Sequence, residues 1–270
     1  MRLPIAQVYH GKWQELLTGR GRPVFRAVIY SPPYNIGVPY DTYKDKVSWD
    51  RWLGEAQLLG AMLQRYCMAG ASLWVNLGQS RECPEMPGLY LAEMRKAGWI
   101  VQNEIAWIKA ATSLDDAGQE FNWGNHRPLQ HEGLLWKGWE RVIHLVRSED
   151  YPVKLNREAL GVPFSDKSNI RRFGHARDLR CRGNVWEIPY VVNQSKDHPA
   201  QFPVEVPLRC LALMDGTFSE PIPHVLDPYG GVGNTMMAAA FHGWDVTQCE
   251  ISSAYCAKAV ERWNKLWEKT

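Results

Sequence analysis

The segment 224–252 is the part of this chain that most restricts how it can fold. Its pattern predicts, in order, a strand, a turn, a helix and a second strand, over residues 224–227, 228–233, 234–242 and 244–249. The turn contains Gly230, Gly231 and Gly233, which let the backbone approach a ligand closely at the carboxyl end of a strand. A strand, a helical crossover and a second strand in this order are typical of a parallel sheet.

This turn is a candidate cofactor site. Glu250 follows Asp227 by 23 positions, and an acid at the end of the second strand can accept hydrogen bonds from ribose hydroxyls. A dinucleotide and a nucleoside both fit such a site. The turn is neither G-x-G-x-x-G nor a P-loop ending in G-K-[ST], so a nucleoside without pyrophosphate, such as S-adenosylmethionine, fits better. The alternative is a structural glycine turn in an unrelated α/β fold.

A second candidate site follows the strand predicted over 24–30. Ser31, Pro32, Pro33 and Tyr34 come directly after it. The prolines remove two backbone donors and leave carbonyls free to accept hydrogen bonds, and Ser31 adds a side-chain oxygen. Two acceptors can hold an exocyclic amine and direct its lone pair toward an electrophile, while Tyr34 offers an aromatic face for the ring. The alternative is a proline-rich turn after an edge strand.

The remaining pattern alternates strands with helices. Helices are predicted over 49–68, where Gly70 ends the helix, and over 89–97, 203–214 and 253–267; strands are predicted over 71–77 and 99–108. Residues 110–130 are predicted to form a mobile loop, and 131–146 two short strands. This alternation predicts an α/β fold with a mostly parallel sheet.

Charge is concentrated in one stretch, residues 151–182. It holds eight basic and three acidic residues, whereas the net charge of the whole chain is only +2. Five arginines are candidates for phosphate or base-edge contacts with DNA. They are Arg171, Arg172, Arg177, Arg180 and Arg182. The alternative is a solvated basic face without a ligand.

Other features indicate a cytoplasmic protein without a membrane span or a metal. The six cysteines form no C-x-x-C pair, which is typical of reduced thiols. The N-terminus does not resemble a signal peptide, and the chain has no apolar stretch of 18 residues. His126 and His131 have no evident third metal ligand, so we expect structural histidines.

Taken together, these segments resemble the DNA amino-methyltransferases that modify adenine-N6 or cytosine-N4. The family's catalytic motif, [DNS]-P-P-[YFW], corresponds to Ser31–Tyr34, and its cofactor motif, L-D-P-F-x-G-x-G-T-T, to Leu226–Thr235. His198–Pro203 resembles the segment before the cofactor-side helix, and Gly183–Pro189 resembles the end of the target-recognition region. The catalytic motif precedes the cofactor motif, as in the permuted β group.

The resemblance implies a Rossmann-like, S-adenosylmethionine-dependent methyltransferase fold with a mostly parallel, seven-stranded sheet. It divides the chain into a catalytic part at 1–147, a target-recognition insert at 148–196 and a cofactor-binding part at 197–270. It also implies that the base leaves the duplex to reach the catalytic motif.

Roles for single residues follow from the same resemblance. Ser31 and Pro32 would accept hydrogen bonds from the target amine within the catalytic motif, which also includes Pro33, and Tyr34 would stack on the base. The residues that would surround S-adenosylmethionine come from the two cofactor motifs. They are Phe202, Pro203, Asp227, Pro228, Tyr229, Gly230, Gly231, Gly233 and Glu250. Among them, Glu250 would hold the ribose.

The chain also departs from the family pattern. Many relatives carry Gly-Asp near the N-terminus, where this chain has Gly11-Lys12, and Tyr229 and Asn234 replace a usual Phe and Thr. Ser in the first catalytic position is commoner in cytosine-N4 enzymes, so cytosine is the favoured base and adenine-N6 the alternative.

The resemblance makes double-stranded DNA the expected partner. A cognate restriction endonuclease and a homodimer are both compatible with it. The competing functions are methylation of RNA or of a small molecule, and DNA binding without catalysis by a protein that retains the fold.

Overall fold

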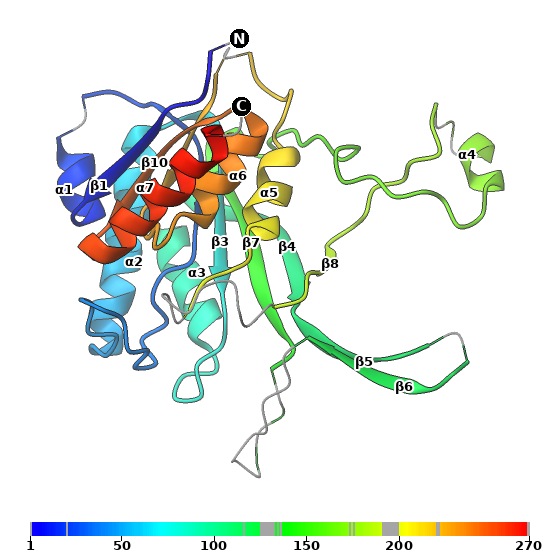
Figure 1. The fold of residues 1–270 in the computed structure, drawn as a ribbon, viewed down its shortest axis with the longest axis horizontal. Helices are drawn as coiled ribbons and strands as arrows, with labels where there is room; N and C mark the ends of the chain where they lie inside the picture. The colour runs from blue at the N-terminus through cyan, green and yellow to red at the C-terminus, as the bar shows by residue number, and fades with distance from the viewer. Residues whose placement is uncertain are drawn as a thin grey trace.

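The computed structural model describes residues 2–19, 21–115, 117–124, 133, 135, 137–172, 174, 176–190, 200–219 and 222–268. These residues form an eight-stranded sheet in the order β1-β10-β9-β2-β3-β7-β4-β8 (Figure 1). Its strands are β1 (Ala6–His10), β2 (Phe25–Tyr30), β3 (Cys67–Leu77), β4 (Trp99–Ile108), β7 (Trp139–Arg147), β8 (Val185–Glu187), β9 (His224–Asp227) and β10 (Asp245–Glu250).

Most neighbouring strands in this sheet run parallel. Only β7 runs antiparallel to both of its neighbours, β3 and β4, whereas the other five pairings are parallel. The predicted α/β fold with a mostly parallel sheet is confirmed. The sheet has one strand more than the seven that the resemblance implied, and its edge strand β8 has only three residues.

Helices cover both faces of the sheet and bury two apolar cores against it (Figure 1). One face is covered by α1 (Trp13–Thr18), α2 (Trp49–Tyr66) and α3 (Met86–Lys96), and the other by α5 (Glu205–Ala212), α6 (Asn234–His242) and α7 (Ser253–Trp267). The strands between the helices are buried on both faces; all six residues of β2, for example, are buried. Such double coverage is typical of parallel sheets.

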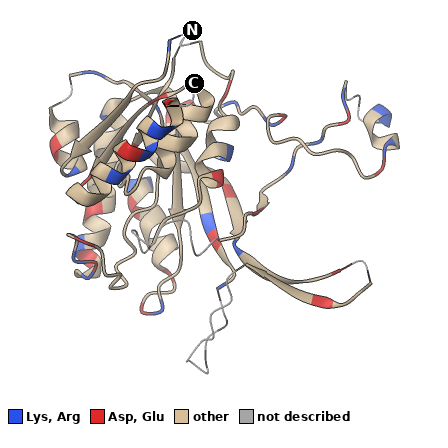
Figure 2. Cartoon of the chain, in the orientation of Figure 1, with Lys and Arg blue, Asp and Glu red and all other residues tan. Residues whose placement is uncertain are grey.

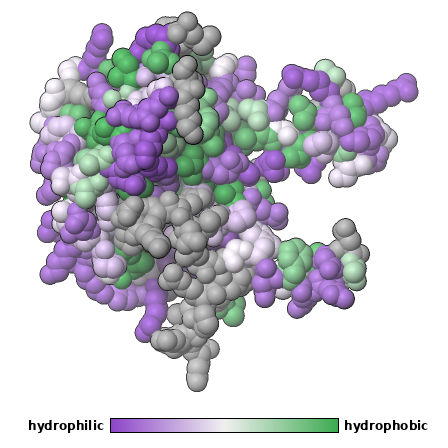
Figure 3. Space-filling model, viewed as in Figure 1, coloured by the Kyte–Doolittle hydropathy of each residue, from purple (hydrophilic) through white to green (hydrophobic). Residues whose placement is uncertain are grey.

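Two structures project from the same side of the molecule (Figure 1). One is a hairpin of β5 (Ala110–Leu114) and β6 (Glu120–Gly124). The other, the α4 arm, comprises residues 151–184 and contains the short helix α4 (Ser168–Arg172). Lys and Arg residues occur along this arm (Figure 2), and much of its surface is hydrophilic (Figure 3).

The structure corrects three local predictions. Within the mobile loop predicted over 110–130, β5 and β6 form a hairpin instead, because cross-strand pairing stabilises a sequence with little apolar periodicity. Residues 125–130 of that range lie outside the described residues. Residues 139–147 form one uninterrupted strand, β7, whereas two short strands were predicted within 131–146; residues 131, 132, 134 and 136 of that range lie outside the described residues. Helix α2 ends at Tyr66 instead of Gly70, which lies within β3 at a positive φ of 70°.

Among the described residues, no helix is long and apolar enough to cross a membrane. All six cysteines are free, and only Cys181 is exposed.

The strand order reverses between β9 and β2. From β9 the sheet continues through β10 to β1, and from β2 it continues through β3, so the connections diverge on the two sides of this point. In parallel α/β sheets, ligands bind outside the carboxyl ends of the strands at such a switch point. The glycine-rich turn follows β9 and the Ser-Pro-Pro-Tyr segment follows β2, so the fold places both candidate sites there.

Candidate active site

The glycine-rich turn is held in place by the buried carboxyl group of Asp227, the last residue of β9. Its Oδ1 accepts a hydrogen bond from the Tyr229 amide at 2.9 Å, and its Oδ2 accepts one from the Thr235 hydroxyl at 2.6 Å. Asp227 is only 2% exposed. Burial raises its pKa to about 7, although these hydrogen bonds oppose the shift.

Glu250, at the end of β10, closes the other side of the turn. Its Oε2 accepts a hydrogen bond from the Gly231 amide at 2.9 Å, and its Oε1 accepts one from the Ser252 amide at 2.8 Å. Burial raises its pKa as well. Gly230 packs so closely on the next strand that a Cβ atom there would lie 2.6 Å from the Gln248 side chain. The glycines therefore allow close backbone packing as well as close approach of a ligand to the backbone.

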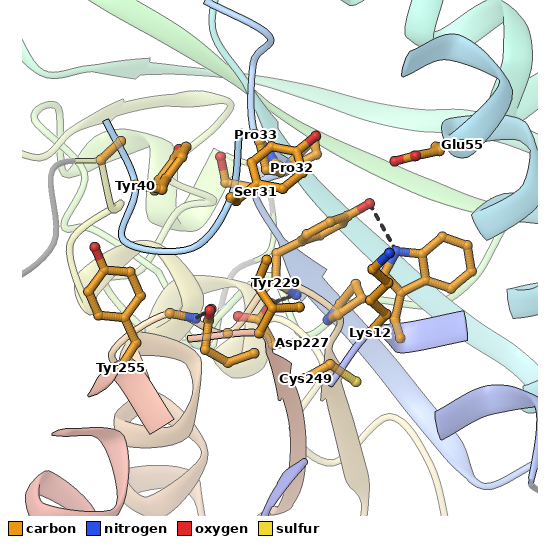
Figure 4. A pocket seen from close by; sticks show the side chains of 18 of the residues that line it. Lys12, Ser31, Pro32, Pro33, Tyr40, Glu55, Asp227, Tyr229, Cys249 and Tyr255 are labelled. Carbon is orange, nitrogen blue, oxygen red and sulfur yellow. Dashed lines mark hydrogen bonds between the residues drawn. The ribbon is translucent and has the colours of Figure 1, made fainter. Parts of the chain in front are cut away.

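A cavity of about 320 Å³ opens above this turn. Figure 4 shows Asp227 and Tyr229 on one side of it and Ser31 and Pro32 facing them. The Tyr229 hydroxyl accepts a hydrogen bond from Trp13 Nε1 at 3.1 Å. We call this space the first cavity; its volume lies within the ~300–1,000 Å³ usual for small-ligand pockets.

The Ser31–Tyr34 segment and the loop that follows it are held by several hydrogen bonds. Trp52 Nε1 donates to the carbonyl of Pro33 at 2.7 Å. Asn35 adopts a left-handed conformation with a φ of 60°, and its side chain exchanges hydrogen bonds with the backbone of Val47. The carboxylate of Asp45 accepts hydrogen bonds from three backbone amides, those of Asn35, Ile36 and Val38. These contacts tie the ends of the 35–47 loop together.

A second cavity, of about 300 Å³, lies on the other side of the Ser31–Tyr34 segment. It is lined by Tyr34 and Asn76 and by the aromatic side chains of Trp107 and Tyr190. The two cavities share a wall, to which Ser31 and Pro32 both belong. Phe202, from the segment before α5, lies on the same wall.

A polar cluster at the second cavity was not predicted from the sequence. The Tyr34 hydroxyl lies 3.1 Å from Glu140 Oε2 and 2.5 Å from Asn76 Nδ2. Glu140 also forms an ion pair with Lys109 at 2.5 Å. Asn76 lies near the end of β3, but Glu140 lies at the start of β7. Because β7 is antiparallel, its start reaches the same sheet edge, and no local sequence signal gives that orientation.

The structure places most predicted cofactor residues around the first cavity. Phe202, Asp227, Pro228, Tyr229, Gly230, Gly231 and Glu250 line it. Pro203 and Gly233 are not among the lining residues: Pro203 is buried just before α5, and Gly233 is the N-cap of α6 with a φ of 87°. Lys12, which departs from the family pattern noted in the sequence, also lines the cavity.

The five predicted DNA-contacting arginines are all exposed and belong to the α4 arm. Arg177 forms an ion pair with Glu158 at 2.8 Å. Several other positions singled out in the sequence, namely His126, His131, His198 and Pro199, lie outside the described residues. Within the described residues, no group of three or more His, Cys, Asp or Glu side chains could hold a metal ion.

The first cavity suits S-adenosylmethionine chemically. Asp227 and Glu250 flank the glycine-rich turn at one side of a mainly apolar and aromatic space, whose lining also includes Lys12, Arg51 and Glu55. Burying carboxyl groups without a cation raises their pKa, so a positively charged ligand would stabilise their ionised forms. An open, mostly parallel sheet with a ligand cavity at its switch point places the protein in the class of Rossmann-like α/β proteins.

Comparison with known proteins identifies the family. Residues 25–261 match the model of the N6/N4 DNA methylase family, described as DNA methylase, and the chain belongs to this family. It is 25% identical over 283 aligned residues to the type II methyltransferase M.ScaI of Streptomyces caespitosus. This alignment covers 94% of this chain and 80% of that protein. It is also 25% identical over 250 residues to the DNA adenine methyltransferase YhdJ of Escherichia coli K12, covering 87% and 74%.

Solved structures share the fold. TTHA0409 from Thermus thermophilus, complexed with S-adenosyl-L-methionine, superimposes with a TM-score of 0.63 at 21% identity, covering 97% of this chain and 94% of that one. The cytosine-N4-specific PvuII DNA methyltransferase gives a TM-score of 0.67 at 14% identity, covering 99% and 95%. The protein is thus an S-adenosylmethionine-dependent DNA methyltransferase of the N4/N6 family.

Proposed function

We propose that this protein methylates the exocyclic amine of a base that has left the DNA duplex, and that the base is cytosine, modified at N4. The observation that carries this proposal is the wall shared by the two cavities. Ser31 and Pro32 line both of them, so groups on this wall can contact a cofactor on one side and a base on the other. Adenine-N6 is the alternative target within the same family.

In the first cavity, Asp227 and Glu250 hold the cofactor. S-adenosylmethionine carries a positively charged sulfonium, which makes its methyl group electrophilic. Asp227 lies at the carboxyl end of β9, and its hydrogen bonds to Thr235 and Tyr229 fix its two oxygens. Glu250 can still accept hydrogen bonds from the ribose hydroxyls, because each carboxylate oxygen can accept more than one hydrogen bond.

In the second cavity, the Ser31 hydroxyl and the Pro32 carbonyl accept hydrogen bonds from the two N–H groups of the target amine. This geometry directs the nitrogen lone pair at the methyl group. For a poor nucleophile, such orientation lowers the activation barrier. The ring of Tyr34 stacks on the base. S-adenosylmethionine, when bound, would supply the methyl group and leave as a neutral thioether, and the proton lost by the amine would pass to solvent.

The target base has to leave the duplex, because an enzyme cannot reach the target atom while the base is stacked within it. The exposed arginines of the α4 arm contact the DNA backbone or base edges. The order of the motifs supports membership of the β group. Similarity to a type II methyltransferase supports a role in restriction and modification beside a cognate endonuclease.

The proposal is tested by incubating the protein with methyl-labelled S-adenosylmethionine and DNA and then digesting the DNA to nucleosides. Mass spectrometry should show labelled N4-methylcytosine. Labelled N6-methyladenine instead would overturn the assigned base but keep the family activity. Unlabelled DNA from all tested sequences, with cofactor binding intact by calorimetry, would contradict catalysis on duplex DNA.

A further inference from the structure

The hydroxyl of Tyr34 lies at the centre of the polar cluster described above. Four groups lie within hydrogen-bonding distance of it: Ser31 Oγ at 3.0 Å, Asn76 Nδ2 at 2.5 Å, Glu140 Oε2 at 3.1 Å and the Asn76 backbone oxygen at 3.3 Å. A phenol has one proton to donate and two lone pairs to accept with. The chemistry of its neighbours therefore decides where that proton points.

Glu140 is the side chain of the cluster that can only accept. Its Oε1 takes the ion pair from Lys109, and its Oε2 accepts from Asn76 Nδ2 at 2.7 Å as well as from Tyr34. The carboxylate oxygen also fixes the Asn76 amide, because the NH₂ end has to face it. The Asn76 backbone oxygen can also accept the Tyr34 proton, which would again point away from Ser31. Compared with the Glu140 carboxylate, however, this oxygen is uncharged and lies farther from the Tyr34 hydroxyl.

The hydrogen-bond directions in the cluster follow from this one constraint. Tyr34 donates its proton to Glu140, so both of its lone pairs are left to accept. Asn76 Nδ2 fills one of them, and the Ser31 hydroxyl donates to the other. The Ser31 proton is thereby directed at Tyr34, and the lone pairs of Ser31 Oγ remain for a ligand at the shared wall.

We infer that Glu140 is a positioning residue that acts through Tyr34 to make Ser31 a hydrogen-bond acceptor for the target amine. The inference rests on the proposed function, in which Ser31 has to accept. A carboxylate in the position of Ser31 would accept in every orientation, but a hydroxyl can equally present its proton. A Ser31 that presented its proton would repel an N–H of the amine. The cluster removes that orientation.

Tyr34 is also held in place from its other side. Gly78 follows β3, and a Cβ atom there would lie 2.7 Å from Cε2 of Tyr34 and 3.3 Å from the carboxyl carbon of Glu140. The ring and the carboxylate thus occupy space that only glycine leaves open. Tyr34 and Glu140 are packed as a unit, and Tyr34 has little room to turn its hydroxyl away from Glu140.

The test is a double-mutant cycle with Glu140→Gln and Tyr34→Phe, measured as single-turnover methyl transfer at saturating cofactor and DNA. Glutamine keeps the size of the side chain but offers one oxygen to three donors, so its NH₂ group faces either Lys109 or the Tyr34–Asn76 pair. We expect each single variant to lose roughly tenfold in rate. In the Tyr34→Phe background, adding Glu140→Gln should cost less than about twofold, because the path to Ser31 is already broken.

Calorimetry and a matched variant separate positioning from folding. S-adenosylmethionine affinity should stay within about twofold in all variants, because the cluster does not line the first cavity apart from Ser31. Glu104→Gln is the control. This substitution removes an ion pair with Arg141 on the same pair of strands, but Glu104 does not belong to the cluster. The methyl-transfer rate of the control variant should therefore match the wild type.

Several results of these measurements would overturn the role inferred for Glu140. A Glu140→Gln rate equal to the wild type, or losses that multiply in the double variant, would overturn the inference while leaving the proposed function intact. If Glu140→Gln does not fold, Tyr34→Phe alone decides, since a wild-type rate in that variant would also overturn it. A wild-type protein that methylates no DNA amine would refute the proposed function, and the inference with it.

Discussion

At the scale of single residues, the buried carboxyl of Asp227 predicts a pH dependence of cofactor binding. Its pKa is raised to about 7, so the carboxyl is mostly protonated below pH 7 and mostly charged above it. If the charged form holds the cationic cofactor, binding has to release that proton at lower pH. Affinity for S-adenosylmethionine should therefore fall by up to about tenfold for each pH unit below 7. Calorimetry from about pH 5.5 to 8.5 measures this slope.

Asp227→Asn supplies the comparison, because asparagine keeps the shape but does not titrate. Its affinity should be weaker at high pH and nearly constant across the range. Glu250 has a raised pKa as well, but it is present in both proteins, so the difference between the two slopes reports Asp227. Equal slopes would mean that Asp227 does not face the positive charge of the cofactor.

At the scale of elements, the 35–47 loop depends on one buried side chain. Asp45 is 3% exposed and accepts hydrogen bonds from three backbone amides at 2.8, 3.2 and 3.0 Å. Asp45→Ala would leave these amides without an acceptor, and we expect the free energy of unfolding to fall by roughly 2–4 kcal/mol. Urea unfolding measures the change.

The loop also carries Tyr40, which lies on the wall shared by the two cavities. Asp45→Ala should therefore weaken cofactor binding in the fraction of molecules that remain folded. Asp50→Ala is the control, because Asp50 is exposed in the first turn of α2 and its loss should cost less than about 1 kcal/mol. A similar loss in both variants would argue against a special role of Asp45.

The elements with strong local periodicity could be predicted from the sequence. Strands β4 and β9 and helices α6 and α7 begin and end at the predicted residues. Strand β8 could not be predicted, because its three residues pair only through contact with β4, from far away in the chain. The β5–β6 hairpin was missed for the same reason: its ladder, and not its apolar pattern, stabilises it.

The candidate site shows the same division. The residues of the two motifs follow strands directly, so the switch-point rule places them together. Glu140 and Lys109 belong to no motif. Glu140 reaches Tyr34, and Lys109 reaches Glu140, because antiparallel β7 begins at the sheet edge where β4 ends. An isolated Glu in a predicted strand carries no signal of that pairing.

At the scale of the whole molecule, the two projections extend from the side of the sheet that carries β4 and β8 (Figure 1). The second cavity contains Trp107 and Lys109, one at the end of β4 and the other just beyond it, so it lies at the base of the hairpin. The α4 arm continues the chain from β7 and returns to the sheet as β8. A duplex bound against the arm would therefore lie beside the cavity that we assign to the target base.

This arrangement predicts that charge on the arm affects DNA binding without affecting the cofactor. Arg171→Glu with Arg172→Glu reverses two exposed charges on α4. DNA affinity should fall, and the slope of log affinity against log salt should become shallower by about 2, because two fewer counterions are released. Fluorescence anisotropy at several salt concentrations measures both, while calorimetric affinity for S-adenosylmethionine should not change.

Lys258→Glu with Lys265→Glu makes the same change of charge on α7, a helix of the core, and should leave the slope intact. Equal slopes for the wild type and the α4 variant would place the DNA elsewhere, since a contact with phosphate cannot be lost without changing the salt dependence.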